Sequence, residues 1–138
     1  MLNRIPGLLA GLVLVLTSSA WAQGATAKEP MSDGRTLSQW VTELKTGVAP
    51  QTRNAAAYEI SGMGPAAAPA VPALIEALDD PAPSVRFPVL VALREIGPAA
   101  KAAVPKLKKM VDEETNDEIA AAAKRALRRI EPSAVTSE

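Results

Sequence analysis

Apolar residues in the middle of the chain recur at the spacing of an amphipathic helix. The first stripe occupies positions i, i+3, i+4 and i+7, which fall on one face of a helix. Its members are Val71, Leu74, Ile75 and Leu78. The segment 79–83, which contains two aspartates and two prolines, then breaks the pattern. This stretch predicts one helix that ends in a turn.

A second helical stripe follows the turn. Its members lie at i, i+4, i+7, i+8 and i+11 and are Val85, Val89, Ala92, Leu93 and Ile96. Gly97 supplies a C-terminal cap, and Pro98 prevents the helix from continuing. Pro88 lies inside this second helix and lacks a backbone donor, so we expect a kink or a later helix start between Ser84 and Pro88. The two stripes together predict an antiparallel helical hairpin.

The same pair of helices recurs with a nearly fixed period. Residues 71–74, Val-Pro-Ala-Leu, return as Val-Pro-Lys-Leu at 104–107, an offset of 33. Residues 64–67, Gly-Pro-Ala-Ala, return at 97–100 with the same offset. A period of this size is typical of a solenoid, because each helical pair can bury its apolar face only against a neighbouring pair.

The repeat predicts an all-α, right-handed α-solenoid of three antiparallel helical hairpins. The three repeats are expected at residues 36–68, 69–101 and 102–134, giving about six helices of roughly 11–16 residues. Gly, Pro, Ser and Asp residues over 23–35 predict a flexible lead-in, and residues 135–138 a disordered tail.

The first 22 residues have the pattern of an export signal. Arg4 precedes an apolar run from 5 to 16, and small residues stand at Ala20 and Ala22, where a signal peptidase cleaves. The run is shorter than the roughly 20 residues of a membrane-spanning helix. We expect cleavage before Gln23 and a periplasmic or secreted protein without a transmembrane span; the alternative is an uncleaved N-terminal anchor.

Two segments of the repeats resemble those of a known family. Residues 70–86 (AVPALIEALDDPAPSVR) and 94–107 (REIGPAAKAAVPKL) are similar to short bacterial HEAT repeats. This resemblance implies a scaffold that binds other proteins, with the second helix of each repeat lining a concave surface.

The resemblance also implies a ladder of polar contacts between adjacent repeats. An aspartate in the turn and an arginine six residues later form it in this family, and Asp80 and Arg86 match that spacing. The first repeat has Arg53 but Gly47 at the aspartate position. The third has Glu113, while Ala120 replaces the arginine, so the ladder is expected to be incomplete.

Composition removes most catalytic chemistry. The chain has neither cysteine nor histidine, so thiolate nucleophiles and the commonest general base and metal ligand are missing. The remaining carboxylates lack the spaced loop of a calcium site, and their positions suit helix capping. We therefore expect no catalytic residue, cofactor or metal. The formal net charge of zero gives no reason to expect nucleic acid as a partner.

Two groups of residues remain as candidate partner-binding sites. On the second helix of the middle repeat, a stripe opposite the core predicts a line that receives a partner helix or peptide. It consists of Phe87, Leu90, Val91 and Arg94. The alternative is that a middle helix, with neighbours on both sides, simply buries a wider arc.

The second group is basic and lies on the third repeat. It consists of Lys124, Arg125 and Arg128, with Arg129, Lys106, Lys108 and Lys109 nearby. This basic end predicts contact with an anionic partner, whereas the alternative is a solvated face that caps the last repeat.

These observations favour a non-catalytic, exported protein-binding scaffold or adaptor. A structural stub that self-associates or docks on a larger envelope assembly is the alternative. An accessory lyase-like enzyme component is the third reading, and it has the least support because three repeats offer little room for a ligand.

Overall fold

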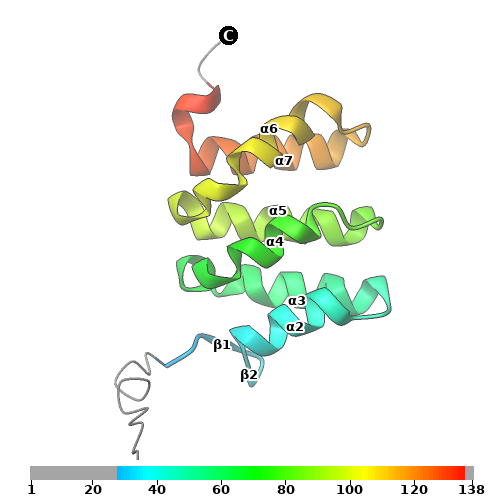
Figure 1. Ribbon diagram of the computed structural model, residues 1–138, viewed down its shortest axis with the longest axis vertical. Helices are drawn as coiled ribbons and strands as arrows, with labels where there is room; N and C mark the ends of the chain where they lie inside the picture. Colours follow the sequence, from blue (N-terminus) through cyan, green and yellow to red (C-terminus); the bar gives the residue numbers. More distant parts are fainter. Residues whose placement is uncertain (1–27, 136–138) are drawn as a thin grey trace, which may run out of the picture.

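The computed structural model describes residues 28–135, and they form three stacked helical hairpins (Figure 1). The six α-helices of this region are α2 (Leu37–Thr46), α3 (Pro50–Gly62), α4 (Val71–Ala77), α5 (Pro83–Ile96), α6 (Val104–Glu113) and α7 (Asp117–Ile130). The prediction of an all-α solenoid built from three helical pairs is confirmed.

The helices lie in two layers that run the length of the stack. Helices α2, α4 and α6 form one layer, and α3, α5 and α7 form the other, which we call the B layer (Figure 1). Helix α5 packs against both α3 and α7. The middle helix of the B layer is therefore covered on both sides.

Short 3-10 helices join one hairpin to the next. Segments η1 (Gly64–Ala70) and η2 (Gly97–Ala103) both begin with Gly-Pro, and both glycines have a positive φ, +57° for Gly64 and +76° for Gly97. The predicted cap at Gly97 is confirmed, since glycine adopts this conformation without a Cβ clash. These connectors shorten the helices that follow: α4 has 7 residues and α6 has 10, fewer than expected.

The core consists of the predicted stripes and many alanines. The stripe of α5 is fully buried, and Leu74 of α4 and Leu78, which follows the last residue of α4, belong to the same cluster. Small side chains at the contacts let the helix axes come close, and the alanines buried there include Ala56, Ala57, Ala92, Ala123 and Ala126.

The described part of the lead-in is ordered as a hairpin, which corrects the expectation of a flexible segment over 23–35. Strands β1 (Met31–Ser32) and β2 (Arg35–Thr36) pair antiparallel around Asp33 and Gly34. Both turn residues have a positive φ, 47° and 72°, as an Asp-Gly hairpin turn requires. The indole Nε1 of Trp40 donates to the Ser32 carbonyl at 2.9 Å, so the hairpin covers the open end of the first repeat.

Several predictions concern residues at the chain ends. The signal segment 1–22 and the tail residues 136–138 lie outside the described residues. Val135, the first residue of the expected tail, instead ends η3 (Pro132–Val135), which packs on α7. Within 28–135, the longest helices have 14 residues, and none is long and apolar enough to cross a membrane.

Candidate protein-binding surface

The B layer presents equivalent positions of three consecutive helices on one face. Each B helix buries one apolar stripe and turns the opposite side outward. Proline occupies the first position of α3 and α5, while Asn116 caps α7 by accepting from the backbone N–H groups of Glu118 and Ile119. These residues determine where each of the three helices begins.

The apolar line predicted on α5 is only partly on the surface. Phe87 and Val91 are half-buried, and Arg94, also half-buried, pairs with Glu95 at 2.6 Å. Leu90 is only 1% exposed and belongs to the core, which corrects its assignment as a partner-binding residue. The reason is the alternative weighed above: α5 has a helix on each side and buries a wider arc.

A groove of about 310 Å³ crosses the B layer near the N-terminal ends of α5 and α7. Its lining includes Tyr58 from α3, Phe87 and Pro88 from α5, and Ile119 from α7. Tyr58 is 49% exposed, which is high for a large apolar side chain. Asn54, Ser84, Asn116 and Glu118 add polar groups. The groove therefore mixes apolar and polar groups: Tyr58 and Phe87 are its accessible apolar side chains, and Asn116 and Glu118 are polar groups at the start of α7.

Pro88 does not delay or interrupt α5, so the expectation of a later start is wrong. The helix begins at Pro83 and continues through Pro88. Because proline has no N–H, the carbonyl of Ser84 lacks its usual partner four residues later. The side-chain amide of Asn54, from the preceding repeat, donates to that carbonyl. A contact between two repeats thus satisfies the group that the proline leaves open.

The basic residues of α7 lie beside this groove. Arg125 and Arg128 are exposed, and Lys124 is half-buried at the edge of a second groove, of about 310 Å³, on the end of the third repeat. None of the three forms an ion pair with another described residue. All three lie on α7, whereas Phe87 lies on the neighbouring helix α5.

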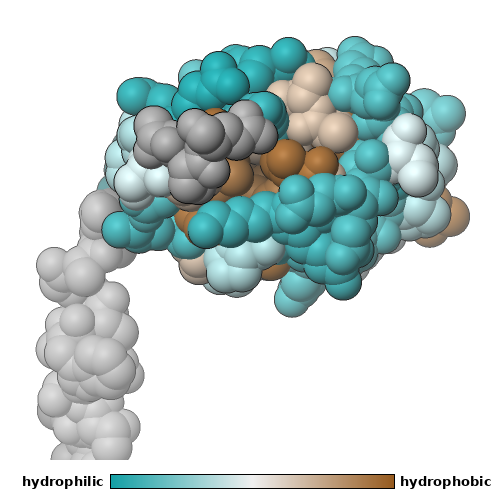
Figure 2. All heavy atoms as spheres, turned by 90° about the horizontal axis from the view of Figure 1, so that it is seen from above, coloured by the Kyte–Doolittle hydropathy of each residue, from teal (hydrophilic) through white to brown (hydrophobic). Residues whose placement is uncertain are grey.

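The end of the third repeat has partly buried apolar side chains between charged ones. Figure 2 looks onto this end and shows hydrophobic atoms in the centre with hydrophilic atoms around them. The groove there is lined by Lys108, Val111, Asp112, Lys124, Leu127, Ala134 and Val135. The opposite end of the stack, in contrast, carries the β-hairpin over Trp40.

The polar ladder exists between the first and second repeats. Arg53 donates to both carboxylate oxygens of Asp80, from Nε at 2.6 Å and from Nη2 at 3.0 Å. Its Nη1 also donates to the Gly47 carbonyl at 2.8 Å, which ties the arginine to its own turn. With 15% and 8% of their side chains exposed, Arg53 and Asp80 form a bidentate, largely dehydrated pair.

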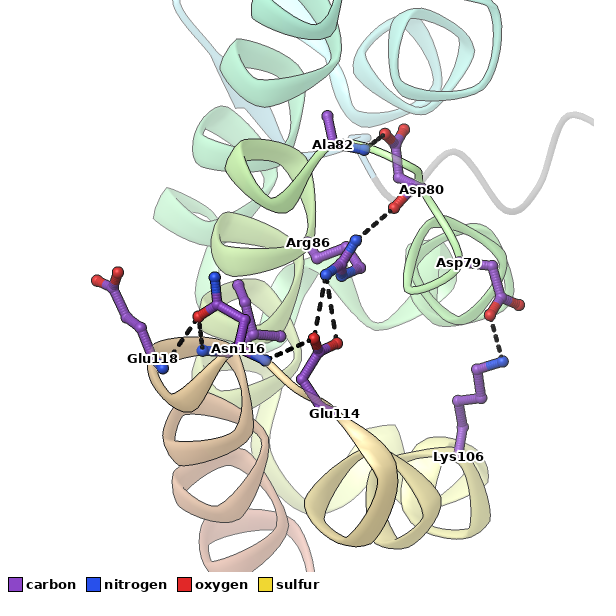
Figure 3. A network of polar contacts seen from close by, with 9 residues as sticks. Asp79, Asp80, Ala82, Arg86, Lys106, Glu114, Asn116 and Glu118 are labelled. Carbon is purple, nitrogen blue, oxygen red and sulfur yellow. Dashed lines mark hydrogen bonds and ion pairs between the residues drawn. The ribbon is translucent and has the colours of Figure 1, made fainter.

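The second rung joins the middle repeat to the third. Figure 3 shows Arg86 between Asp80 and Glu114: Nη1 donates to the Asp80 carbonyl at 2.9 Å, and Nη2 lies 3.3 Å from both Glu114 oxygens. The acidic partner is therefore Glu114 and not Glu113, because α7 begins 34 residues after α5 and not 33, which places Glu114 three residues before its helix, as Asp80 is. Glu113 instead pairs with Lys109 on its own helix at 3.7 Å.

The ladder shifts the pKa of its two best-bound members. The Arg53 guanidinium holds the pKa of the Asp80 carboxyl below its ordinary value, and burial opposes this only in part. The hydrogen bond to Asp80 in turn raises the pKa of Arg53. The Ala82 N–H also donates to Asp80 at 2.9 Å and favours the ionised carboxylate.

Another groove, between the second and third repeats, offers no chemistry beyond this ladder. It has a volume of about 390 Å³, and Asp79, Arg86, Lys106 and Glu114 are among its lining residues. These side chains already pair with one another across the groove, for example Lys106 with Asp79 at 2.5 Å. Residues 28–135 contain no group of three or more acidic, His or Cys side chains that could hold a metal ion.

The sequence analysis missed Tyr58 and Asn54 as part of the B-layer surface. The period of 33 places Asn54 at the position of Phe87 and Tyr58 at that of Val91. Projecting the candidate positions of α5 back by one repeat could have found both. Their side chains were overlooked because the first repeat lacks an obvious apolar line.

Comparison with known proteins supports the repeat assignment. Searches of curated proteins and of solved structures found no match to this chain. A family model described as HEAT repeats matches residues 37–128, which covers the three helical hairpins except for the last two residues of α7. The periodic sequence, the stacked hairpins and this match agree, and the chain belongs to the HEAT repeat family.

Proposed function

We propose that the protein is an exported, non-catalytic scaffold that binds a partner protein through the B-layer face. HEAT repeats generally act as protein-interaction scaffolds, and the family is typically non-catalytic. The observation that carries the proposal is the groove across α3, α5 and α7, where Tyr58 and Phe87 offer apolar surface to a ligand. A binding face built from three rigid helices needs little ordering when a partner docks.

The basic residues of α7 extend this face toward an anionic partner. Arg125 and Arg128 are exposed and have no described counter-ion, so a carboxylate-bearing surface gains ion pairs there without displacing an existing one. Their position beside the groove supports contact with the same partner.

Capture experiments test the binding role. The mature protein, tagged at its C-terminus, is incubated with an envelope fraction, and the bound proteins are identified by mass spectrometry. We expect a defined partner that is lost with Phe87→Asp or Arg125→Glu. Lys45→Glu, a charge reversal on α2 outside this face, serves as the control. If neither change on the B layer alters the captured proteins, the proposed face is wrong.

Export has its own test. The apolar run from 5 to 16 and the alanines at 20 and 22 support removal of the first 22 residues. Fractionation of cells that produce the full chain is expected to recover a protein that begins at Gln23 outside the cytoplasm. Recovery of the intact chain in the cytoplasm would contradict this part of the proposal.

A second candidate function is docking of the third repeat on another copy or on a larger assembly. The apolar side chains on the end of this repeat favour it (Figure 2). Size-exclusion chromatography with light scattering distinguishes the two functions, because self-association predicts a mass that rises with protein concentration. A monomer at all concentrations favours the scaffold.

A further inference from the structure

We propose that the B-layer face selects an acidic amphipathic helix. Its apolar side chains would fill the groove at Tyr58 and Phe87, and its carboxylates, about two turns further along, would pair with Arg125 and Arg128. This inference rests on the proposed protein-binding function and adds the chemistry of the partner.

Unpaired positive charge is concentrated on one part of the molecule. Of the 15 lysines and arginines, all except Arg4 lie in the described range, and eight take part in an ion pair. The six described cations without an ion pair are Lys28, Lys108, Lys124, Arg125, Arg128 and Arg129. All but Lys28 belong to the third repeat.

The spacing of these cations opposes local stability. Lys124 and Arg128, and likewise Arg125 and Arg129, stand four residues apart on α7, where like charges repel across one helical turn. The C-terminal end of the helix dipole offsets part of this repulsion for Arg128 and Arg129. Carboxylates of a partner would remove the remaining repulsion, and the cluster therefore indicates an anionic partner.

The groove supplies the apolar half of the recognition. Tyr58 is 49% exposed and Phe87 is half-buried, so these two side chains form the accessible apolar part of the lining, while Pro88 and Ile119 are buried. A volume of about 310 Å³ accommodates one or two aliphatic or aromatic side chains and not a large ligand. The groove and the cations therefore indicate a ligand that carries both apolar and acidic groups.

The distance along α7 between the groove and the arginines determines how far apart the apolar and acidic residues of the ligand must be. Arg125 and Arg128 follow Glu118, the exposed groove residue of α7, by seven and ten positions, which corresponds to about 10 and 15 Å along the helix. Seven residues of a ligand helix span about 10 Å and return to the same face. A helix with apolar residues followed by glutamates about two turns away therefore matches this surface.

Charges at the two ends of α7 fix the direction of the ligand. Asp117 and Glu118 occupy the first turn, and Glu118 lies at the groove. These carboxylates repel acidic groups at that end, so the acidic part of the ligand lies over Arg125 and Arg128. The same two carboxylates disfavour a uniformly anionic surface such as a lipid bilayer, which would approach both ends of α7 at once.

Fluorescence anisotropy with designed peptides tests the proposal on the mature protein. The probe is an alanine-based helical peptide with two leucines one turn apart and two glutamates about seven residues further along. We expect it to bind at least about tenfold more tightly than the same peptide with lysines in place of the glutamates, and more weakly as salt is raised. Equal affinity for both peptides, or no binding of the acidic one, would overturn the proposal.

Variants assign the binding to the two features. Arg125→Glu and Arg128→Glu are each expected to weaken binding of the acidic peptide about tenfold, and Tyr58→Asp to weaken binding of both peptides. Lys45→Glu lies on α2 with a side chain 50% exposed and is the matched control, expected to bind like the unchanged protein. Circular dichroism verifies that each variant is folded. Undiminished binding by both arginine variants would contradict the assignment.

Two further arms separate this inference from the proposed function. Vesicles containing anionic phosphatidylglycerol test the membrane as the partner; if they bind and the acidic peptide does not, the inference is wrong. In the capture experiment, loss of the natural partner with Tyr58→Asp but not with Arg125→Glu or Arg128→Glu would retain the protein-binding function and refute the acidic partner.

Discussion

The first and third repeats bury similar apolar stripes, but their charged side chains are placed differently. In the first repeat, Arg53 binds Asp80 and Lys45 lies 3.3 Å from Glu76, so both connect it to the middle repeat. Arg35 pairs with Glu43 and stacks over Trp40 at 4.2 Å. In the third repeat, four adjacent cations of α7 have no ion pair among the described residues.

The ends of the stack differ in the same sense. The β-hairpin covers the first repeat through the Trp40–Ser32 hydrogen bond, while the end of the third repeat has partly buried apolar side chains between charged ones (Figure 2). Charges directed toward a neighbouring repeat stabilise the stack, and charges directed outward remain available to a partner. Charged residues in similar repeats can therefore either stabilise the stack or bind a partner. Which of the two they do depends on whether a neighbouring repeat places an opposite charge within reach.

Leu93→Ala should have the largest effect on stability, because Leu93 is fully buried in α5, the helix that contacts both outer repeats of the B layer. We expect a loss of about 3 kcal/mol in the free energy of unfolding, measured by urea denaturation with circular dichroism. Both outer repeats should unfold in one transition. Val48→Ala, at a side chain 96% exposed, is the control and should change little. Two separate transitions would show that the outer repeats do not depend on α5.

Removing the two ladder carboxylates should distinguish the two rungs. Asp80→Ala is expected to cost about 2 kcal/mol, because the carboxylate is 8% exposed and accepts two short bonds from Arg53. Glu114→Ala should cost about half as much, since both of its bonds to Arg86 are 3.3 Å long. Urea denaturation of both variants measures the difference. The reverse order would contradict the greater strength of the first rung.

The contribution of Asp80 should depend on pH. Its pKa is lowered in the folded protein, chiefly by the Arg53 hydrogen bond, so the unfolded chain takes up the proton at a higher pH. The stabilisation is fully present above the unfolded pKa of about 4 and is lost as pH falls through the lowered folded value. The free energy of unfolding of Asp80→Asn should be lower than that of the unchanged protein by a constant amount from pH 7 downward. This difference should shrink below about pH 4, as urea denaturation at a series of pH values down to pH 3 would show. A difference in the free energy of unfolding that grows as the pH falls would contradict a lowered pKa of Asp80 in the folded protein.

Asn54→Ala should cost about 1 kcal/mol, because it removes the donor to the Ser84 carbonyl that Pro88 leaves open. Restoring the backbone N–H with Pro88→Ala should make the Asn54 change nearly neutral. A double-mutant cycle measured by urea denaturation reports this coupling. Independent effects of the two changes would show that the carbonyl is satisfied in another way.

Arg125→Glu should have the smallest effect on stability, within about 0.5 kcal/mol, because the side chain is exposed and unpaired. Thermal unfolding followed by circular dichroism measures it. The same variant should lose the partner, so stability and binding separate in the third repeat. A large loss of stability would place Arg125 among the structural charges and make the third repeat resemble the first.

Much of the fold could be predicted from periodicity alone. The stripes around Leu74 and Leu93, the glycine cap at Gly97 and the period of 33 or 34 residues follow from which positions must face a neighbouring helix. Asp33-Gly34 is also a sequence typical of a hairpin turn, but the polar residues around it led to the prediction of a flexible segment. The short length of α4 could not be predicted from the sequence, because the Gly-Pro-Ala segment before it is compatible with both a loop and a 3-10 helix.

The candidate site was less predictable because it depends on which helices lie side by side. Sequence identified Phe87, Val91 and Arg125 by helical spacing, but it also placed the core residue Leu90 on the surface. Tyr58 became part of the site only when α3 packed beside α5. Glu114 replaced Glu113 in the ladder for the same kind of reason, since turn geometry decides which of two adjacent carboxylates faces Arg86.

The sequence by itself determined that helical hairpins must stack, because each apolar stripe is too narrow to be buried without a neighbouring repeat. It also determined the absence of histidine and cysteine chemistry. Only the tertiary structure decided which charges are satisfied between repeats and which remain on the surface. Pairing depends on distances of a few ångströms across helices far apart in sequence, as between Arg53 and Asp80, and spacing along one chain does not fix those distances.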